Sequence, residues 1–229
     1  MTNDHQNATP EAPRIAVRGE AHIEAEPEIA RIGITVTARG TDRRTALEDL
    51  TRRNTHVLDL IKSYGDALDK TATGTLSITP ELTKRGRGER IRTYHGRVHI
   101  TADLTDFTAL GELTTRLADL DLTSVDGPYW SLRPTSPVHA QARQQAVREA
   151  VQRAREYAEA LGTTLAALIE IADIGAGETF QPGAPRAMMR SAAYGGEAAE
   201  PAPALDLEPQ RQRVRAEVNA RFTMHPPTL

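Results

Sequence analysis

The sequence predicts an α+β fold with a mainly antiparallel sheet, and three observations lead to this prediction. Segments that alternate apolar and polar residues, typical of half-buried strands, are interleaved with segments of helical periodicity. A short Gly-containing run joins two of the strands and is typical of a hairpin. The order strand–helix–strand–strand–helix–strand over residues 29–133 matches a split β-α-β plan. Hairpin-linked strands with helices on one face define the α+β class.

The first strands follow a polar, Pro-containing tail over residues 1–13, which we predict to be disordered. Residues 14–20 alternate apolar and polar side chains, as a half-buried strand does. Pro27 has no amide hydrogen for a sheet and indicates a turn or a strand start. A strand rich in β-branched residues is predicted over 29–38.

Two helices with apolar stripes are predicted over about 42–64 and 104–120. Thr41 or Asp42 can cap the first helix, and Asp103 can cap the second. The side chains that we expect to be buried are, in the first helix, Leu47, Leu50, Val57, Leu58, Ile61 and Tyr64 and, in the second, Phe107, Leu110, Leu113, Leu117 and Leu120. Strands near 73–83 and 90–102 lie between these helices, and another lies near 122–133.

The clearest helix is predicted over residues 137–161. Ser136 is a good N-cap, Pro137 suits the first helical position, and Gly162 suits a left-handed residue after the last turn. Alanine recurs at every fourth position, at Ala142, Ala146, Ala150, Ala154 and Ala158. The buried face of this helix is therefore small and flat, which suits close packing on a sheet.

The C-terminal part contains a segment of ambiguous pattern, a long loop and a last strand. Residues 165–174 fit a strand by their position after the long helix. Residues 175–210 are rich in Ala, Gly, Pro and Glu, and we predict a mobile loop. Strict alternation over 211–222 predicts a closing strand with one wet face. Because this strand has no core of its own, we predict a single domain over 14–225.

Composition excludes several classes of function. The chain of 229 residues has no cysteine, so disulfides, thiol nucleophiles, iron–sulfur clusters and Cys-ligated zinc are excluded. A net charge of −3 argues against a dedicated nucleic-acid binder. We see neither a secretory signal nor an apolar stretch long enough for a membrane helix, so we expect a soluble cytoplasmic protein without a membrane span.

A basic hairpin over residues 84–92 is the sharpest local charge feature, and it comprises Lys84, Arg85, Arg87, Arg90 and Arg92. Arginine pairs bidentately with oxyanions, so this hairpin is a candidate contact for an anionic ligand or partner. The alternative is a solvated hairpin tip that prevents edge-to-edge aggregation of the sheet. The acidic character of the whole chain favours this second interpretation.

A second candidate contact lies in the long loop, where Met188 and Met189 are flanked by arginines. Adaptable methionines can dock onto a partner or a neighbouring subunit. Equally, they can fold back over the edge of the sheet of their own chain. The sequence alone leaves both alternatives open.

No combination of residues supports catalysis, a metal or a cofactor. His95 and His99 are four residues apart in a predicted strand and span ~13 Å, too far to share a metal in a regular strand. No G-x-S-x-G elbow is present, and Gly86-Arg87-Gly88 does not continue as a phosphate-binding loop. We therefore expect a protein that is not an enzyme.

Two short motifs stand at the N-terminal strand: Arg14-Ile15-Ala16-Val17-Arg18-Gly19-Glu20 and, after it, Ala25-Glu26-Pro27-Glu28-Ile29-Ala30. Together they resemble the "I-x-V-x-G-x-G … P-D/E-x-A" opening of the SIMPL domain family. The Ala-rich helix ending at Gly162 and the closing Val218-Asn219-Ala220-Arg221-Phe222 also resemble the family. Tyr94-His95-Gly96 departs from its usual Gly-Tyr motif.

The resemblance implies an α+β fold, no known catalytic residues, and a protein that works by association. Periplasmic members of this family are described as oligomerising, channel-like or stress-protective, and a eukaryotic relative is an adaptor in kinase signalling. We therefore expect a non-enzymatic homo-oligomer that acts as a scaffold or in a stress-related assembly. The alternative is a monomeric adaptor that recognises an anionic ligand or a protein partner through the basic hairpin.

Overall fold

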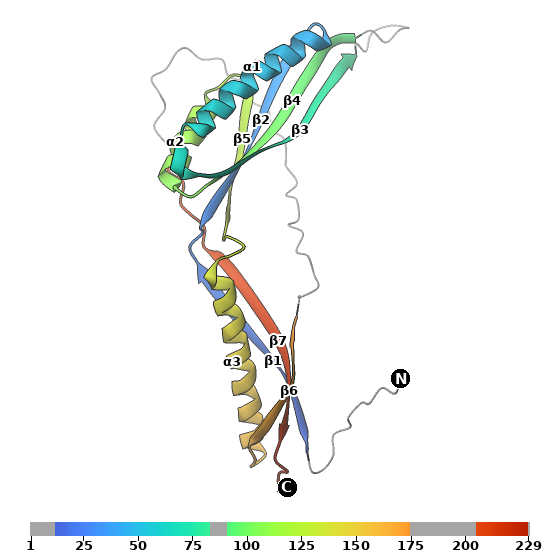
Figure 1. Ribbon diagram of the computed structural model, residues 1–229, viewed down its shortest axis with the longest axis vertical. Helices are drawn as coiled ribbons and strands as arrows, with labels where there is room; N and C mark the ends of the chain where they lie inside the picture. Colours follow the sequence, from blue (N-terminus) through green and yellow to red (C-terminus); the bar gives the residue numbers. More distant parts are fainter. Residues whose placement is uncertain (1–11, 83–90, 175–204, 229) are drawn as a thin grey trace. The chain divides into compact units, whose positions relative to one another are not determined.

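The computed structural model describes residues 12–82, 91–174 and 205–228, which divide into two compact units, each with its own sheet (Figure 1). The first unit contains residues 12–25, 134–174 and 213–228, and the second contains 26–82, 91–133 and 205–212. Three α-helices and antiparallel strands confirm the α+β class. The strands are distributed over two sheets, and the single domain over 14–225 stays a prediction.

The second unit has a four-stranded antiparallel sheet in the order β3-β4-β2-β5. These strands are β2 (Ile29–Gly40), β3 (Leu68–Leu82), β4 (Ile91–Leu104) and β5 (Thr123–Ser131). Helix α1 (Arg43–Lys62) and the 3₁₀ turn η1 (Gly65–Ala67) connect β2 to β3, while β4 lies between these two strands. This arrangement is the split β-α-β plan that the sequence predicts.

Both helices of the second unit begin at an aspartate. Asp42 caps α1 by accepting from the amide of Thr45 at 2.9 Å, as predicted. Helix α2 (Phe107–Ala118) is shorter than its prediction and begins after Asp106, which accepts from the amides of Thr108 and Ala109. The predicted cap Asp103 is wrong: this residue lies inside β4. Both Asp103 and Asp106 are suitable N-cap residues before the apolar stripe of α2, so the sequence does not show which of them caps the helix.

The core of the second unit lies between the sheet and these two helices, which cover one face of it (Figure 1). Alternate residues of β2 and β4 meet the apolar stripes of α1 and α2, with Ile32, Ile34, Ile100, Leu50, Ile61, Leu110 and Leu113 among the fully buried side chains. Trp130 of β5 stands edge-on to Phe107, with 4.8 Å between the ring centroids. Leu47, a predicted stripe member, is 43% exposed, and Ala46 takes the buried position instead.

The first unit has a three-stranded sheet in the order β1-β7-β6, with α3 (Pro137–Ala160) packed on β1. The strands are β1 (Arg14–Ala25), β6 (Leu165–Asp173) and β7 (Gln212–Met224). The five periodic alanines of α3 are all buried, as the sequence predicts. Gly162 has φ +69°, which confirms the left-handed residue after this helix.

Leu205 and Leu207 attach the segment before β7 to the second unit. The amide of Leu205 donates to Thr115 Oγ1 of α2 at 3.2 Å, and Leu207 packs against the core. Residues 175–204 of the predicted loop lie outside the described residues, so its mobility stays a prediction. None of the described helices is long and apolar enough to cross a membrane.

Candidate interaction surface

Strand β6 exposes an unusual amount of apolar surface for a folded strand. Four large side chains are affected: Leu168 is 55% exposed, Ile169 41%, Ile171 46%, and Ile174, which follows the strand, 39%. Single exposed apolar residues are normal on proteins, whereas a contiguous set usually marks an interaction site. We call these four residues the β6 surface.

The β6 surface is exposed because of the place of β6 in the sheet. In the order β1-β7-β6 it is an edge strand of the described residues, and α3 packs mainly over β1. Register shifts at Leu165/Ala167 and Leu168/Glu170 mark two irregularities of β-bulge type. Bulges turn an edge away from regular pairing. The β6 surface therefore consists of exposed side chains beside an irregular row of backbone groups.

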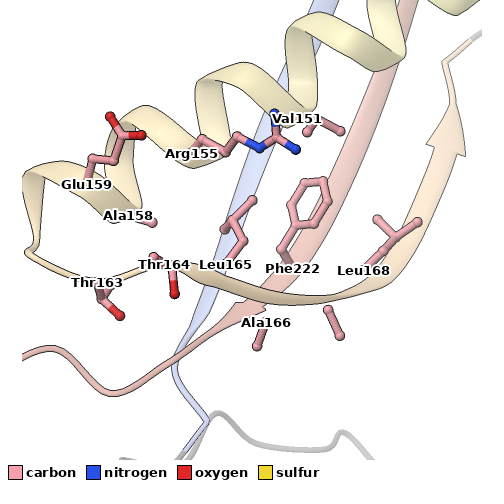
Figure 2. A pocket seen from close by; sticks show the side chains of 11 residues that line it. Val151, Arg155, Ala158, Glu159, Thr163, Thr164, Leu165, Ala166, Leu168 and Phe222 are labelled. Atoms are coloured by element: carbon pink, nitrogen blue, oxygen red, sulfur yellow. The ribbon is translucent and has the colours of Figure 1, made fainter.

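A cavity of about 450 Å³ lies between the C-terminal half of α3 and β6 (Figure 2). Phe222 of β7 and Leu165 of β6 point toward the helix at its floor, and Leu168 lies at one end. Val151 completes the apolar lining from the helix, where Arg155 and Glu159 also lie. The cavity is thus an apolar groove with a charged helical rim, continuous with the β6 surface through Leu168.

Arginines continue along the same side of α3. A second hollow, of about 370 Å³, is lined by Arg143, Gln144, Val147 and Arg148. Residues 144, 148, 151 and 155 are spaced at three or four, so they form one stripe on the helix. We call Arg148, Val151 and Arg155 the α3 flank.

The opposite face of this sheet carries charges that pair with one another. Arg213 of β7 pairs with Glu24 of β1 at 3.1 Å, and Arg221 pairs with Glu170 of β6 at 3.0 Å. Arg18 and Arg215 both contact Glu217. Because these charges are compensated within the unit, this face makes a weaker candidate for a charged partner than the side of α3.

The sheet of the second unit presents a polar face on the side away from its helices. Arg31 of β2 donates two hydrogen bonds to Asp103 of β4, at 2.6 and 2.7 Å. This bidentate pairing raises the pKa of the Arg31 guanidinium. Tyr129 donates to Asp126 at 3.1 Å, and this hydrogen bond raises the pKa of Tyr129. These polar groups hydrogen-bond with one another, so stabilisation of the sheet is a sufficient explanation for their presence on this face.

Most of the site residues predicted from sequence lie outside the described residues. Lys84, Arg85, Arg87 and Arg90, together with Met188 and Met189, are among them, so their role as contacts stays a prediction. Arg92 is described: it is exposed near the start of β4, and its charge helps to lower the pKa of Glu81. The main cause of that lowered pKa is the hydrogen bond between Glu81 and His95, at 2.7 Å.

The two histidines of β4 have separate partners. His95 contacts Glu81, and His99 Nδ1 lies 3.3 Å from Thr35 Oγ1. Among the described residues, no group of three or more His, Asp or Glu side chains is arranged to hold a metal ion.

The sequence pattern does not single out the β6 surface or the α3 flank as candidate contacts. The pattern predicts the helix and the strand themselves, but it does not show which of their exposed side chains lie side by side in the fold. The available signal is the sequence of residues 165–174, LAALIEIADI, which is apolar at positions of both parities and so cannot place all its apolar side chains on one face.

Comparison with known proteins agrees with this architecture. Residues 15–222 match the model of the family described as SIMPL, protein of unknown function (DUF541). The chain belongs to the SIMPL family. The predicted resemblance is therefore confirmed, and this family description assigns no activity.

Relatives of this SIMPL chain are distant in sequence. "Uncharacterized protein YggE" of Edwardsiella ictaluri is 23% identical over 157 residues, which cover 68% of this chain and 66% of the relative. The "26 kDa periplasmic immunogenic protein" of Brucella melitensis is 25% identical over 171 residues, covering 72% of this chain and 68% of the relative. The Brucella abortus protein of the same name matches with the same identity and coverage. The chain thus spans about two thirds of the length of these relatives.

These names correct one expectation. From the sequence we expect a cytoplasmic protein, but the two Brucella relatives are named as periplasmic, which contradicts that expectation.

Proposed function

We propose that this SIMPL protein is a non-enzymatic, self-associating protein that acts in the periplasm as a scaffold or in a stress-related assembly. The observation that carries the proposal is the β6 surface, where four large apolar side chains remain exposed on one edge strand and one of them, Leu168, lines an apolar groove. Removing such a surface from water is favourable by about 25 cal/mol per Å². Association is the direct way for a folded chain to gain this free energy.

Side-chain packing supports this proposal better than extension of the sheet does. The two irregularities in the pairing of β6 disturb the row of backbone groups that a new strand would need. Leu168 and Phe222 face each other across the β6–β7 pair, so a side chain that covers Leu168 also closes the groove above Phe222. The periplasmic location is proposed from the names of the Brucella relatives.

The test is the mass of the protein in solution, measured by light scattering after size-exclusion chromatography over a range of concentrations. We expect the wild-type chain to exceed the 25.0 kDa of one copy. Leu168→Lys combined with Ile171→Lys should shift the mass toward one copy. Leu76→Lys is the matched control, because Leu76 is 57% exposed on β3 of the other unit. A wild-type monomer at all concentrations, or equal effects of both variants, would contradict the proposal.

A further inference from the structure

We infer that the partner of the β6 surface is the α3 flank of a second copy, in a reciprocal contact that pairs Asp173 of each copy with Arg148 and Arg155 of the other. This inference rests on the proposed self-association and specifies its partner and its charge pairing. It also makes the contact dependent on salt.

The α3 flank offers positive charges that have no ion pair with any other described residue. Arg148 and Arg155 are seven residues apart, two helical turns, so they lie on the same side of α3 with Val151 between them. Their neighbour Arg153 is paired with Glu149 at 2.9 Å. Within the part of the chain that the structure describes, neither Arg148 nor Arg155 forms an ion pair, and both are exposed.

Strand β6 offers the complementary negative charge on its apolar side. Leu168, Ile171 and Asp173 lie opposite Phe222, Ala220 and Val218 of β7, which are all buried. These three residues of β6 therefore share the face of the sheet on which α3 packs. Asp173 is exposed and has no ion pair in the described ranges, whereas Glu170 is paired with Arg221.

The two surfaces therefore match in chemistry, since each has apolar side chains and the two carry opposite charges. The α3 flank has a valine between two arginines, above an apolar groove, and β6 has two large apolar side chains followed by an aspartate. An arginine can pair bidentately with a carboxylate while its stem covers apolar surface. Because each copy carries both surfaces, a two-fold arrangement satisfies the two sets at once and doubles the contact area.

The other groups on this side of the unit leave the pairing in place. Glu159 is the acidic residue that lines the groove together with Arg155. Glu159 lies one turn after Arg155, so it partly offsets the positive charge of Arg155. It is about three turns away from Arg148 and leaves that arginine available for an acidic partner. Arg143 also lines the second hollow, beside Arg148, and adds positive charge there.

A charge exchange between two variants tests the reciprocal contact. In Arg148→Asp/Arg155→Asp both surfaces are negative, and in Asp173→Arg both are positive. Each variant alone should lose at least about tenfold in self-affinity, because like charges then face each other at the interface. An equimolar mixture should regain the association, since each copy then meets the opposite sign at both contacts. Light scattering gives the masses, and a tag on one variant shows by pull-down that both are present.

The controls separate this inference from the proposed function. Arg43→Asp/Arg44→Asp makes the same change of charge on exposed positions of α1 and should leave the mass unchanged. Circular dichroism checks that every variant is folded, and Arg148→Gln/Arg155→Gln repeats the test without introducing acids. The charge variants at Arg148, Arg155 and Asp173 could assemble as the wild type does while Leu168→Lys/Ile171→Lys does not. In that case self-association stands and the reciprocal contact is wrong. Loss of association in both variants without recovery in the mixture would also overturn it.

Discussion

Gly19 of β1 lies so close to Ala150 of α3 that a Cβ at position 19 would stand 2.8 Å from the Cβ of Ala150 and 2.6 Å from its amide nitrogen. Real Cβ atoms essentially never lie closer than 3.0 Å to another heavy atom, so β1 or α3 would have to move. The glycine of the family-like opening motif and the alanines of the long helix thus serve one purpose, which is the close approach of this helix to its sheet.

The first prediction concerns this contact. Gly19→Ala should destabilise the first unit by about 1–3 kcal/mol because its methyl group overpacks a backbone contact. Urea denaturation followed by circular dichroism at 222 nm measures the effect. Gly74→Ala is the control, since a Cβ there meets its nearest atom at 3.5 Å. Equal stability of the two variants would show that α3 can shift without cost.

The second prediction concerns the pair between Arg31 and Asp103. The Asp103 side chain is only 8% exposed, so Arg31→Met leaves a nearly buried carboxylate without its bidentate donor. We expect a loss of about 1–3 kcal/mol in the free energy of unfolding. Fluorescence of Trp130, the single tryptophan, follows this unit during urea denaturation. Arg39→Met, an exposed change in the same strand, should have little effect.

The third prediction concerns acid. The hydrogen bond from Arg53 Nε, at 2.9 Å, lowers the pKa of Asp49, and Arg52 contributes a second contact. A carboxyl with a lowered pKa in the folded state stabilises that state fully above its unfolded pKa of about 3.9, and the contribution is lost as the pH falls through the folded value. Asp49→Asn should therefore flatten the dependence of unfolding free energy on pH below about pH 4.

Urea titrations at several pH values from neutral to strongly acidic check this expectation. Asp59→Asn on the same helix is the matched control, because Asp59 is exposed and has no side-chain ion pair among the described residues. An unchanged slope in Asp49→Asn would mean that the ion pairs of Asp49 do not survive in solution.

The fourth prediction concerns Gly111 in α2. Glycine to alanine ordinarily stabilises a helix by about 1 kcal/mol. Here a Cβ would collide with the carbonyl oxygen of Leu205, so Gly111→Ala should instead loosen the segment at Leu205 and Leu207. Limited proteolysis should then cut this segment faster than in the wild type, as it should in Thr115→Val, which removes the hydrogen bond to the Leu205 amide. Thr108→Ala, also in α2, should not accelerate the cleavage.

Local chemistry made much of the fold predictable, and the remainder depended on contacts far apart in the sequence. Asp42, Ser136 and Gly162 act on backbone groups within a few residues, so their roles follow from spacing. Leu47 illustrates the limit: α1 begins directly against Gly40, where only a residue as small as Ala46 fits, and the neighbouring leucine turns outward. The periodicity of a sequence does not show that the backbone at Gly40 lies this close to α1.

The candidate surface was hidden for the same reason. Alternation along a strand tells which side chains share a face, but it does not tell which strand lies beside it or whether a helix covers it. Leu168 and Ile171 are exposed because β6 is at the edge and α3 packs mainly on β1. Arg148 and Arg155 become candidate contacts only because they line hollows beside α3, which the sequence does not reveal.

The alanine face of α3 has a thermodynamic consequence. Five buried methyl groups remove far less apolar area from water than the leucines of α1 and α2 do, and burial stabilises in proportion to area. The first unit therefore draws less of its folding free energy from its own helix than the second does. A fold of this kind is stabilised further by whatever binds its native form, by mass action. We expect the melting temperature of the first unit, and not that of the second, to rise with the concentration of the protein.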